Sequence, residues 1–587
     1  MRTEAIPRSL APLAGVLAAW LGASVASCRA AEITLDHGDR ADVDLAVRDA
    51  TPALRLLLPE AILAEGLGEI GGVHGAAGSW VEDERAIQGW IRPRPDAACL
   101  VRLEPLERAV GIAIAVKNLS RRTWTDVRLD ICANLCRLPK TWKAPWSNRD
   151  FIPERIPLDR DAQGRYWYRE ATPRGLQAWD PARGWIPMHL RPDSPDPLPE
   201  NPYHAELSAT DASVACAIPS LDGKRFAYMV WRARRSRHQS PFSGNACMHL
   251  RPQAAPSLAP GETATLFGEA GIFEGSREDL EEHLARVSRE APPAGGDGRP
   301  RILKHGTVDL DLVETTPIVF RGRPLRFEWV RAGYWNNALK ENHFRFVDLA
   351  DGSATRPFAR GYAFGNAFVE GDTVYVTGTF ENREVHVFAS RDLERWETWP
   401  AIAESGYGIY NTSVAKAGDE YVLMFEIDRP AEEAGVPFTA RFARSRDLRS
   451  WTIAPPECCY AKDRYSAPHC LRYHDGWFYD FYLEAHRGYE MRVVRSRDLV
   501  RWEPSPLRPV LRASPEDKLI ANPALTEAQR EKIRAAENIN NSDLDICEWN
   551  GRLLITYSWG DQRGTEFLAE ASYEGALGEF LRGWFPP

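Results

Sequence analysis

Blocks of basic residues are absent from this chain of 587 residues. Its 82 Asp and Glu outnumber its 73 Lys and Arg, and the formal net charge is −9 at pH 7. A protein that binds nucleic acid needs clustered cations to neutralise phosphates. The sequence therefore excludes nucleic acid as an expected partner.

Long apolar runs are also lacking, except at the very start. Arg2 and Arg8 precede a stretch from Ser9 to Ser27 without a charged residue, and Ala30 and Ala31 close it. This pattern predicts a signal peptide over residues 1–31 and export to the periplasm or the extracellular space. The segment Val25-Ala26-Ser27-Cys28 resembles a bacterial lipobox, so a lipid anchor on Cys28 is the alternative to simple cleavage. No later stretch is apolar for long enough to cross a bilayer.

A zinc-ligand pattern is missing too, because no two pairs of Cys or His lie at matching spacing. We expect no metal in the functional site and no required cofactor. Of the ten Cys, nine remain after Cys28, so at least one is unpaired if the others form disulfides. Cys132 and Cys136 are close enough in sequence to bridge, whereas the adjacent Cys458 and Cys459 are not expected to pair with each other.

Trp, Gly and Pro are plentiful, at 20, 43 and 43 residues, as is typical of a turn-rich β protein. Residues 32–290 show short alternating runs such as Val110 to Val116, separated by turn residues, which predict a β-sandwich accessory domain. A helix is expected over 276–288. The Pro- and Gly-rich stretch within 291–300 is typical of a linker.

One seven-residue phrase occurs three times in the remaining part, residues 301–587. It has the form Ser-Arg-Asp-Leu-x-x-Trp and starts at Ser390, Ser445 and Ser496. A repeat of about 50 residues is typical of propeller blades. In each phrase Ser and Asp can accept hydrogen bonds from the amides ahead, and Leu and Trp can fill the gap between blades, so its role is structural.

Five hairpin signals divide the same region, each a Gly followed by an aromatic or aliphatic strand. They are Gly322, Gly371, Gly418, Gly476 and Gly551. Five hairpins predict five blades, with a helical insertion over 526–536 before the last one. The fold class expected is all-β, an N-terminal β-sandwich followed by a C-terminal five-bladed β-propeller.

The repeats and the segment from Ser466-Ala467-Pro468-His469 to Asp475-Gly476-Trp477 resemble the five-bladed propellers of glycoside hydrolase family 43 and the related arabinanases, invertases and levansucrases. The resemblance covers about half the chain and implies a propeller that acts on carbohydrate. Two positions depart from the family pattern: Thr316 precedes Pro317 where the family has an Asp, and His469 replaces the acid of the Ala-Pro strand.

Strand geometry points to other acids. In each blade the inner strand starts, and the second strand ends, at the pocket face. Asp543 is the predicted general base with Asp545 on the same strand face, and a bound structural Ca²⁺ in the propeller channel or an Asp-held turn is the alternative role. Glu426 or Glu484 is the predicted general acid, since an apolar strand would raise its pKa, and a salt bridge to an arginine such as Arg429 or Arg487 is the alternative.

Further side chains are expected at the same face. His469 is a predicted proton carrier or sugar contact, with a structural role as the alternative. The predicted substrate-binding residues are polar or aromatic side chains at the blade rims: Asp545, Asn411, Asn366, Glu314, Tyr410, Trp335 and Trp559.

These residues favour an exported glycosidase that is a monomer or small oligomer and uses paired carboxylates on a poly- or oligosaccharide. A non-catalytic carbohydrate-binding protein is a second hypothesis, because two family positions are substituted. A sugar phosphorylase or lyase on the same fold is a third.

Overall fold

The computed structural model describes residues 33–586 except for sixteen internal gaps. These are 38–41, 48–53, 66–67, 73–77, 84, 138–145, 152–157, 161–165, 169–176, 183, 188–213, 234–235, 240–246, 290–297, 332–340 and 486–488. The predicted signal peptide, Cys28, most of the predicted linker, Trp335 and Arg487 lie outside the described residues. Within the described part, no helix is both long and apolar enough to cross a membrane.

Two antiparallel sheets share one apolar core in the N-terminal half. The first has the order β1 (Ile33–His37), β2 (Asp42–Val47), β3 (Leu54–Glu65), β9 (Trp124–Asn134), β19 (Cys247–Leu258) and β18 (Ser236–Gln239), with β4 (Gly68–Gly72) beside β3. The second has the order β15 (Gly184–Pro187), β14 (Gln177–Asp180), β16 (Ala215–Pro219), β17 (Arg225–Trp231), β20 (Thr263–Glu274), β8 (Ala109–Asn118), β7 (Ala97–Pro105), β6 (Ile87–Arg94) and β5 (Gly78–Glu82).

Alternation along the strands builds that core. Leu129, Ile131 and Ala133 of β9 pack with Ile112 and Ile114 of β8, while the residues between them on β9 point away from the core. The predicted helix 276–288 is α1 (Arg277–Arg289), which buries Leu280, Leu284 and Val287 beside β17. Two small hairpins complete this half: β10 (Cys136–Arg137) with β11 (Trp146–Ser147), and β12 (Leu158–Arg160) with β13 (Tyr166–Tyr168).

Five antiparallel sheets form the C-terminal half. The first sheet holds β22 (Thr316–Phe320), β23 (Arg323–Val330) and β24 (His343–Asp348), and the second β25 (Tyr362–Glu370), β26 (Thr373–Phe380), β27 (Glu384–Ser390) and β28 (Glu397–Ile402). The third holds β29 (Gly408–Ala417), β30 (Glu420–Arg429), β31 (Thr439–Ser445), β32 (Thr452–Ile453) and β33 (Cys459–Tyr460). The fourth holds β34 (His469–His474), β35 (Trp477–Glu484), β36 (Glu490–Ser496), β37 (Glu503–Pro504) and β38 (Leu511–Arg512).

The fifth sheet joins the start and the end of this half. It has the order β21 (Leu303–Leu310), β41 (Glu566–Tyr573), β40 (Arg552–Gly560) and β39 (Asn540–Trp549). The helices are α2 (Ala431–Ala434), α3 (Glu527–Ala535), α4 (Leu577–Gly583) and the 3₁₀ turn η2 (Pro515–Lys518). The predicted helical insertion is α3, and Thr526 caps it by accepting a hydrogen bond from the Gln529 amide.

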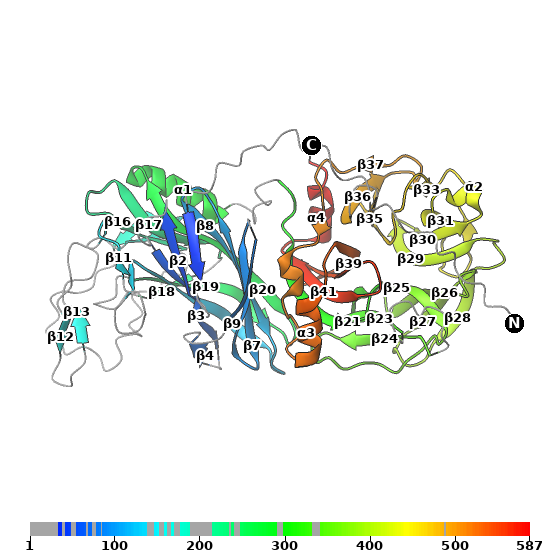
Figure 1. Cartoon of the computed structure of the whole chain (residues 1–587), viewed down its shortest axis with the longest axis horizontal. Coiled ribbons are helices and arrows are strands. Elements are labelled where there is room, and N and C mark those ends of the chain that lie inside the picture. The colour runs from blue at the N-terminus through cyan, green and yellow to red at the C-terminus, as the bar shows by residue number, and fades with distance from the viewer. Residues whose placement is uncertain are drawn as a thin grey trace.

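One strand from each of the five sheets closes a ring, in which β22, β25, β29, β34 and β39 each contact the next and β39 contacts β22. All five predicted hairpin glycines lie in the turn between a ring strand and the strand that pairs with it, with φ between 56° and 80°. Figure 1 shows this half, green to red, beside the N-terminal half, blue to green.

The repeated phrase has the predicted structural role. Ser390 Oγ accepts a hydrogen bond from the Leu393 amide at 2.8 Å, and Asp392 Oδ1 accepts from the Arg395 amide at 2.9 Å. Asp447 and Asp498 hold the same turn in the other two copies. The three Trp side chains pack into the apolar clusters between successive sheets: Trp396, Trp451 and Trp502.

A polar network inside the ring links its strands. Asn366 of β25 donates to Thr316 of β22 at 3.0 Å and to Asp545 of β39 at 2.9 Å, and it accepts from the Val414 amide of β29 at 3.3 Å. Arg472 of β34 forms an ion pair with the same Asp545. The Arg472 guanidinium therefore lies beside Asp545, where the sequence analysis gave a bound structural Ca²⁺ as the alternative.

Replacing Arg472 by Ala should lower the free energy of unfolding by about 3–5 kcal/mol, because Asp545 would be left as an unpaired buried charge. The double variant Arg472→Ala/Asp545→Asn should recover part of this loss, since the charge itself is removed. Urea unfolding midpoints measure both effects. A loss below about 1 kcal/mol in the single variant would show that the pair does not hold the ring together.

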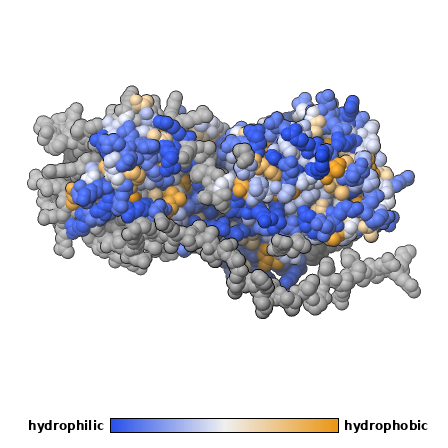
Figure 2. All heavy atoms as spheres, turned by 90° about the horizontal axis from the view of Figure 1, so that it is seen from above, coloured by the Kyte–Doolittle hydropathy of each residue, from blue (hydrophilic) through white to orange (hydrophobic). Residues whose placement is uncertain are grey.

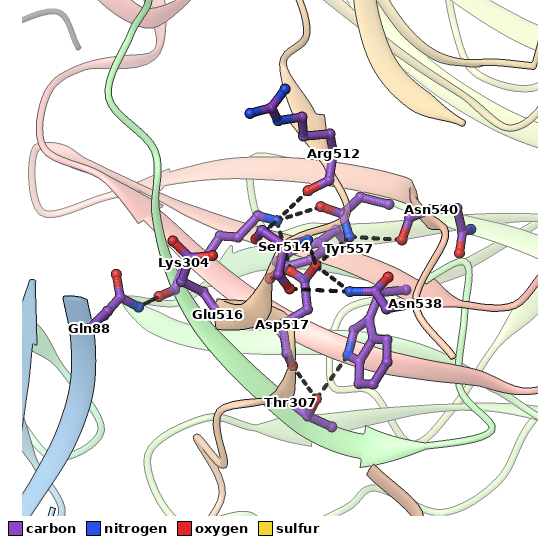
Figure 3. Close-up of polar contacts among 12 residues, drawn as sticks. Gln88, Lys304, Thr307, Arg512, Ser514, Glu516, Asp517, Asn538, Asn540 and Tyr557 are labelled. Atoms are coloured by element: carbon purple, nitrogen blue, oxygen red, sulfur yellow. Dashed lines mark hydrogen bonds and ion pairs between the residues drawn. The ribbon is translucent and has the colours of Figure 1, made fainter. Parts of the chain in front are cut away.

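The two halves meet along β5 to β8 on one side and β21, η2 and the fifth sheet on the other. Trp90 Nε1 donates to the His305 carbonyl at 2.7 Å, and Arg102 pairs with Glu516 at 2.6 Å. Lys304 Nζ contacts Asp517 Oδ1 at 2.8 Å, and Asp517 accepts from Tyr557 (Figure 3). In the view of Figure 2 hydrophilic residues dominate the described surface of both halves.

Candidate active site

Four carboxyl groups are linked through Glu314, which interacts electrostatically with each of the other three: Glu314, Glu426, Asp543 and Glu566, which we call the acid cluster. Burial is the largest cause of the raised pKa values of Glu314, Glu426 and Glu566. Glu314 adds to that of Glu426, and Asp543 adds to those of Glu314 and Glu566. They come from the loop before β22, the end of β30, the start of β39 and the start of β41. The fold therefore brings acids that are distant in sequence into one group.

A bulge in β39 orients Asp543. The pairing of β39 with β40 shifts between Ser542 and Asp545, and Asp543 has a left-handed φ of 53°. Its carboxylate accepts hydrogen bonds from the hydroxyls of Ser542, at 2.7 Å, and Ser558, and from the backbone amide of Glu314. Burial raises the pKa of Asp543, and these donors oppose that rise by stabilising the anion.

Glu426 is fully buried on β30 and lies among neutral donors. Asn411 Nδ2 donates to its Oε2 at 3.0 Å, and the His469 backbone amide donates to its Oε1 at 3.1 Å. Burial raises the pKa of Glu426 to about 8, the direction predicted from its apolar strand. At neutral pH this carboxyl group therefore carries a proton that it can donate.

Glu314, which the sequence assigned to substrate binding, belongs to the acid cluster itself. Burial raises the pKa of Glu314 to about 8 despite Arg331, whose guanidinium lies 3.4 Å from its Oε2. Arg331 also lies over the ring of Trp329, with 4.2 Å from the guanidinium carbon to the ring centroid. Sequence reasoning missed Arg331 as part of the site.

Two residues predicted to be catalytic, Glu484 and His469, are held by structural ion pairs and hydrogen bonds. Glu484 is buried and forms ion pairs with Arg464 at 3.0 Å and Arg492 at 3.6 Å. These pairs favour the salt-bridge role for Glu484 over the role of proton donor. The His469 ring is buried between Asp480, at 2.8 Å from Nδ1, and Ser466, at 3.1 Å from Nε2. Both ring nitrogens are engaged in these contacts, while the backbone amide of His469 donates to Glu426 and the charge of its ring opposes the rise that burial causes in the pKa of Glu426.

Asp545 and Asn366 belong to the polar network of the ring. The sequence predicts that Asp543 and Asp545 share one face, but the bulge between them gives each its own partners. Asp545 accepts from Asn366 and pairs with Arg472. We therefore correct their predicted role from substrate binding to holding the strands.

The prediction that Trp559 is an aromatic platform for a sugar is wrong. Its ring has no exposed surface, stacks on Phe567 at 4.4 Å between centroids, and donates to Thr307 Oγ1 at 2.9 Å. Trp335 lies outside the described residues. Tyr410 is half-buried and donates to Asp428 at 2.8 Å, next to Asn411 in a bulge of β29.

Five aromatic side chains with Tyr410 in the middle form a row of successive ring contacts, which we call the aromatic arc. Successive ring centroids are 4.8 Å apart for Trp329 and Phe364, 5.4 Å for Phe364 and Tyr410, 4.6 Å for Tyr410 and Phe438, and 5.8 Å for Phe438 and Tyr465. Burial and then the charges of Glu426 and Asp543 raise the pKa of Tyr465, so this ring lies within electrostatic range of both acids. The arc thus borders the acid cluster. Sequence reasoning missed Phe364, Phe438 and Tyr465, although Tyr465 directly precedes the Ser-Ala-Pro-His segment.

The raised pKa of Glu426 predicts a pH-dependent stability. Between about pH 4.3, the unfolded value, and about pH 8 the folded chain binds this proton and the unfolded chain does not, so stability falls as pH rises, by up to about 1.4 kcal/mol per pH unit. Glu426→Gln should remove this share of the slope, because glutamine stays neutral. Urea unfolding from pH 5 to 8 tests this, with surface Glu394→Gln as control; equal slopes in wild type and Glu426→Gln would contradict it.

Several solved glycosidases resemble about half of the chain. An α-L-arabinofuranosidase from Podospora anserina in complex with cellotriose matches at 10% identity over 47% of this chain and 97% of that chain, with a TM-score of 0.35. A family 43 endo-arabinanase from Bacillus licheniformis matches at 11% identity over 46% and 96%, with a TM-score of 0.30. A family 43 β-xylosidase/α-arabinofuranosidase from a compost metagenome matches at 13% over 47% and 94%, with a TM-score of 0.31.

These likenesses accord with the resemblance to family 43 seen in the sequence. At such identities they concern the fold alone, and with TM-scores below 0.5 they carry no argument about function. No protein-family profile and no curated protein sequence matches the chain.

Proposed function

We propose that the protein is an exported glycoside hydrolase that cleaves a poly- or oligosaccharide at the acid cluster. The ring of five sheets is then a five-bladed β-propeller over 301–587, and the two-sheet N-terminal half over 32–290 is a β-sandwich that accompanies it. The observation that carries the proposal is the different hydrogen bonding of two buried acids: burial raises the pKa of Glu426 to about 8, whereas three hydrogen-bond donors oppose the rise that burial causes in the pKa of Asp543.

Hydrolysis of a glycosidic bond needs these two roles. In the proposed reaction Glu426 donates its proton to the leaving-group oxygen while Asp543, as the anion, deprotonates a water or attacks the anomeric carbon. Ser542 and Ser558 orient the Asp543 carboxylate through their hydroxyls. Asn411 orients Glu426. The acids are thus fixed before substrate arrives, as preorganised catalysis requires.

The aromatic arc supports a carbohydrate as the substrate. Sugar rings present apolar C–H faces that stack on aromatic side chains, and the half-buried Tyr410, Phe438 and Tyr465 border the acids. The proposed function involves no nucleic acid and no segment that spans a membrane. A monomer or small oligomer suffices, because all four acids come from one chain.

A panel of plant and microbial polysaccharides, assayed for released reducing sugar, tests the proposal. We expect release from at least one glycan, and NMR of the first anomer formed distinguishes inversion from retention. Binding of a glycan without release would favour the non-catalytic binding protein. Release of a sugar phosphate only when inorganic phosphate is present would favour the phosphorylase.

Export is tested separately. Expressed in a bacterial host, the protein should be found outside the cytoplasm and lack residues 1–31 by mass spectrometry. A mass increase from lipid on an N-terminal Cys28 would replace simple cleavage by the lipobox alternative. Retention of the full N-terminus in the cytoplasm would contradict export.

A further inference from the structure

Three neighbouring strands of the first N-terminal sheet bring a thiol, an imidazole and a carboxylate together, far from the acid cluster in sequence. Cys132 lies on β9, His249 on β19 and Glu60 on β3, and their ligand-type atoms all lie within 4.8 Å of one another. It is the one such group of three among the residues that the structure describes.

Strand register explains why these side chains converge. Cys132 and His249 are direct partners across β9 and β19. Asp130 lies two residues before Cys132 and therefore on the same face, opposite to the core face of Leu129 and Ile131. The pairing of β3 with β9 shifts between Leu57 and Ala61, and Glu60 lies within that irregular stretch.

The separations are those of metal ligands. His249 Nδ1 lies 3.6 Å from Glu60 Oε2 and 3.6 Å from Asp130 Oδ1. Both distances are too long for a good hydrogen bond. Two ligands bound to one tetrahedral zinc at about 2.0–2.1 Å are about 3.4 Å apart, close to both His249 separations, and Cys132 Sγ lies within 4.8 Å of the Glu60 and His249 atoms.

Contacts from residues outside this group orient Cys132 and Asp130. Asn134 Nδ2 donates to Cys132 Sγ at 3.2 Å, which stabilises a thiolate. Arg251 contacts Asp130 Oδ2 at 3.0 Å, while the other oxygen, Oδ1, lies 3.6 Å from His249. Such second contacts are typical of metal sites. The side chains of His249 and Glu60 are 14% and 25% exposed, so an ion can reach them from solvent.

We propose that Cys132, His249, Glu60 and Asp130 bind a zinc ion that clamps β3, β9 and β19. A thiolate with an imidazole selects Zn²⁺ over Mg²⁺ or Ca²⁺, which prefer oxygen ligands alone. The sequence shows no zinc-ligand pattern, because these ligands lie on strands that are neighbours in the sheet but far apart in the sequence.

The test uses the full-length protein, stripped with chelator and titrated with Zn²⁺ by calorimetry. We expect one Zn²⁺ per chain, and Co²⁺ in its place should show the absorption of a thiolate-bound tetrahedral ion. Cys132→Ser should abolish that absorption, and Asn134→Ala should weaken binding about 10–100-fold. Cys547→Ser, a thiol variant in the C-terminal half, is the matched control and should bind as the wild type does.

Failure of the wild-type protein to take up zinc would overturn the proposal, as would equal binding by wild type, Cys132→Ser and His249→Gln. If substitution of the buried Cys132 disturbs folding, Glu60→Gln replaces it, because this side chain is partly exposed. That variant should melt as the metal-free wild type does and still bind zinc at least about tenfold more weakly. Unchanged affinity would count against the site.

Discussion

Asp543→Asn is expected to lower kcat on a responsive glycan by about 10²–10⁴-fold, the range for removal of a general base. Asparagine has nearly the same shape and can still contact the hydroxyls of Ser542 and Ser558, so the fold should persist. Initial rates on the glycan found in the panel give kcat, and circular dichroism reports the fold.

Asp372→Asn serves as the control for this variant, since Asp372 lies exposed in the hairpin between β25 and β26. It should retain the wild-type rate. If Asp543→Asn and Asp372→Asn both turn over the glycan at the wild-type rate, Asp543 is not the base. A slow Asp543→Asn enzyme whose rate is restored by azide, a small external nucleophile, would further assign the residue to the reacting face.

Glu426→Gln should also lower kcat by about 10²–10⁴-fold on a natural glycan, because the leaving-group oxygen would lose its proton donor. The loss should be far smaller on an aryl glycoside whose phenol leaves without protonation. In the wild type the acid must be protonated, so the rate should fall as pH rises through about 8, the pKa of Glu426. The pH profile of kcat/KM measures this.

In Glu426→Gln that alkaline limb should vanish, whereas exposed Glu432→Gln should keep it. An alkaline limb that persists unchanged in Glu426→Gln would assign the proton to another group of the acid cluster. Glu314 is the first to examine, because its pKa is also raised to about 8 by burial.

Much of the architecture was readable from local sequence signals. The hairpin glycines need positive φ and the Ser-Arg-Asp-Leu-x-x-Trp turns are closed by neighbouring amides, so both signals lie within a few residues of what they determine. The same holds for Thr526, which caps α3. The five sheets were therefore countable before their arrangement in space was known.

The site was less predictable because non-local contacts decide each role. Glu426 and Glu484 both end apolar strands, yet Arg464 neutralises Glu484, and no pattern in the sequence reveals that pairing. A bulge separates Asp543 from Asp545, although period-two alternation places them on one face. Trp559 was predicted to stack a sugar ring, but its own ring stacks on Phe567 and donates to Thr307, which come from the two ends of the C-terminal half of the sequence.

The junction between the halves bears on how the protein can be dissected. Leu303, Val308, Leu519 and Leu568 share one apolar cluster with Trp90 and Leu100 of the N-terminal half. A truncated chain beginning near residue 298 would expose those four apolar side chains to water and leave Glu516 without Arg102. Such a fragment should self-associate, so enzymology on the second half requires the first half in the same polypeptide or supplied as a separate chain.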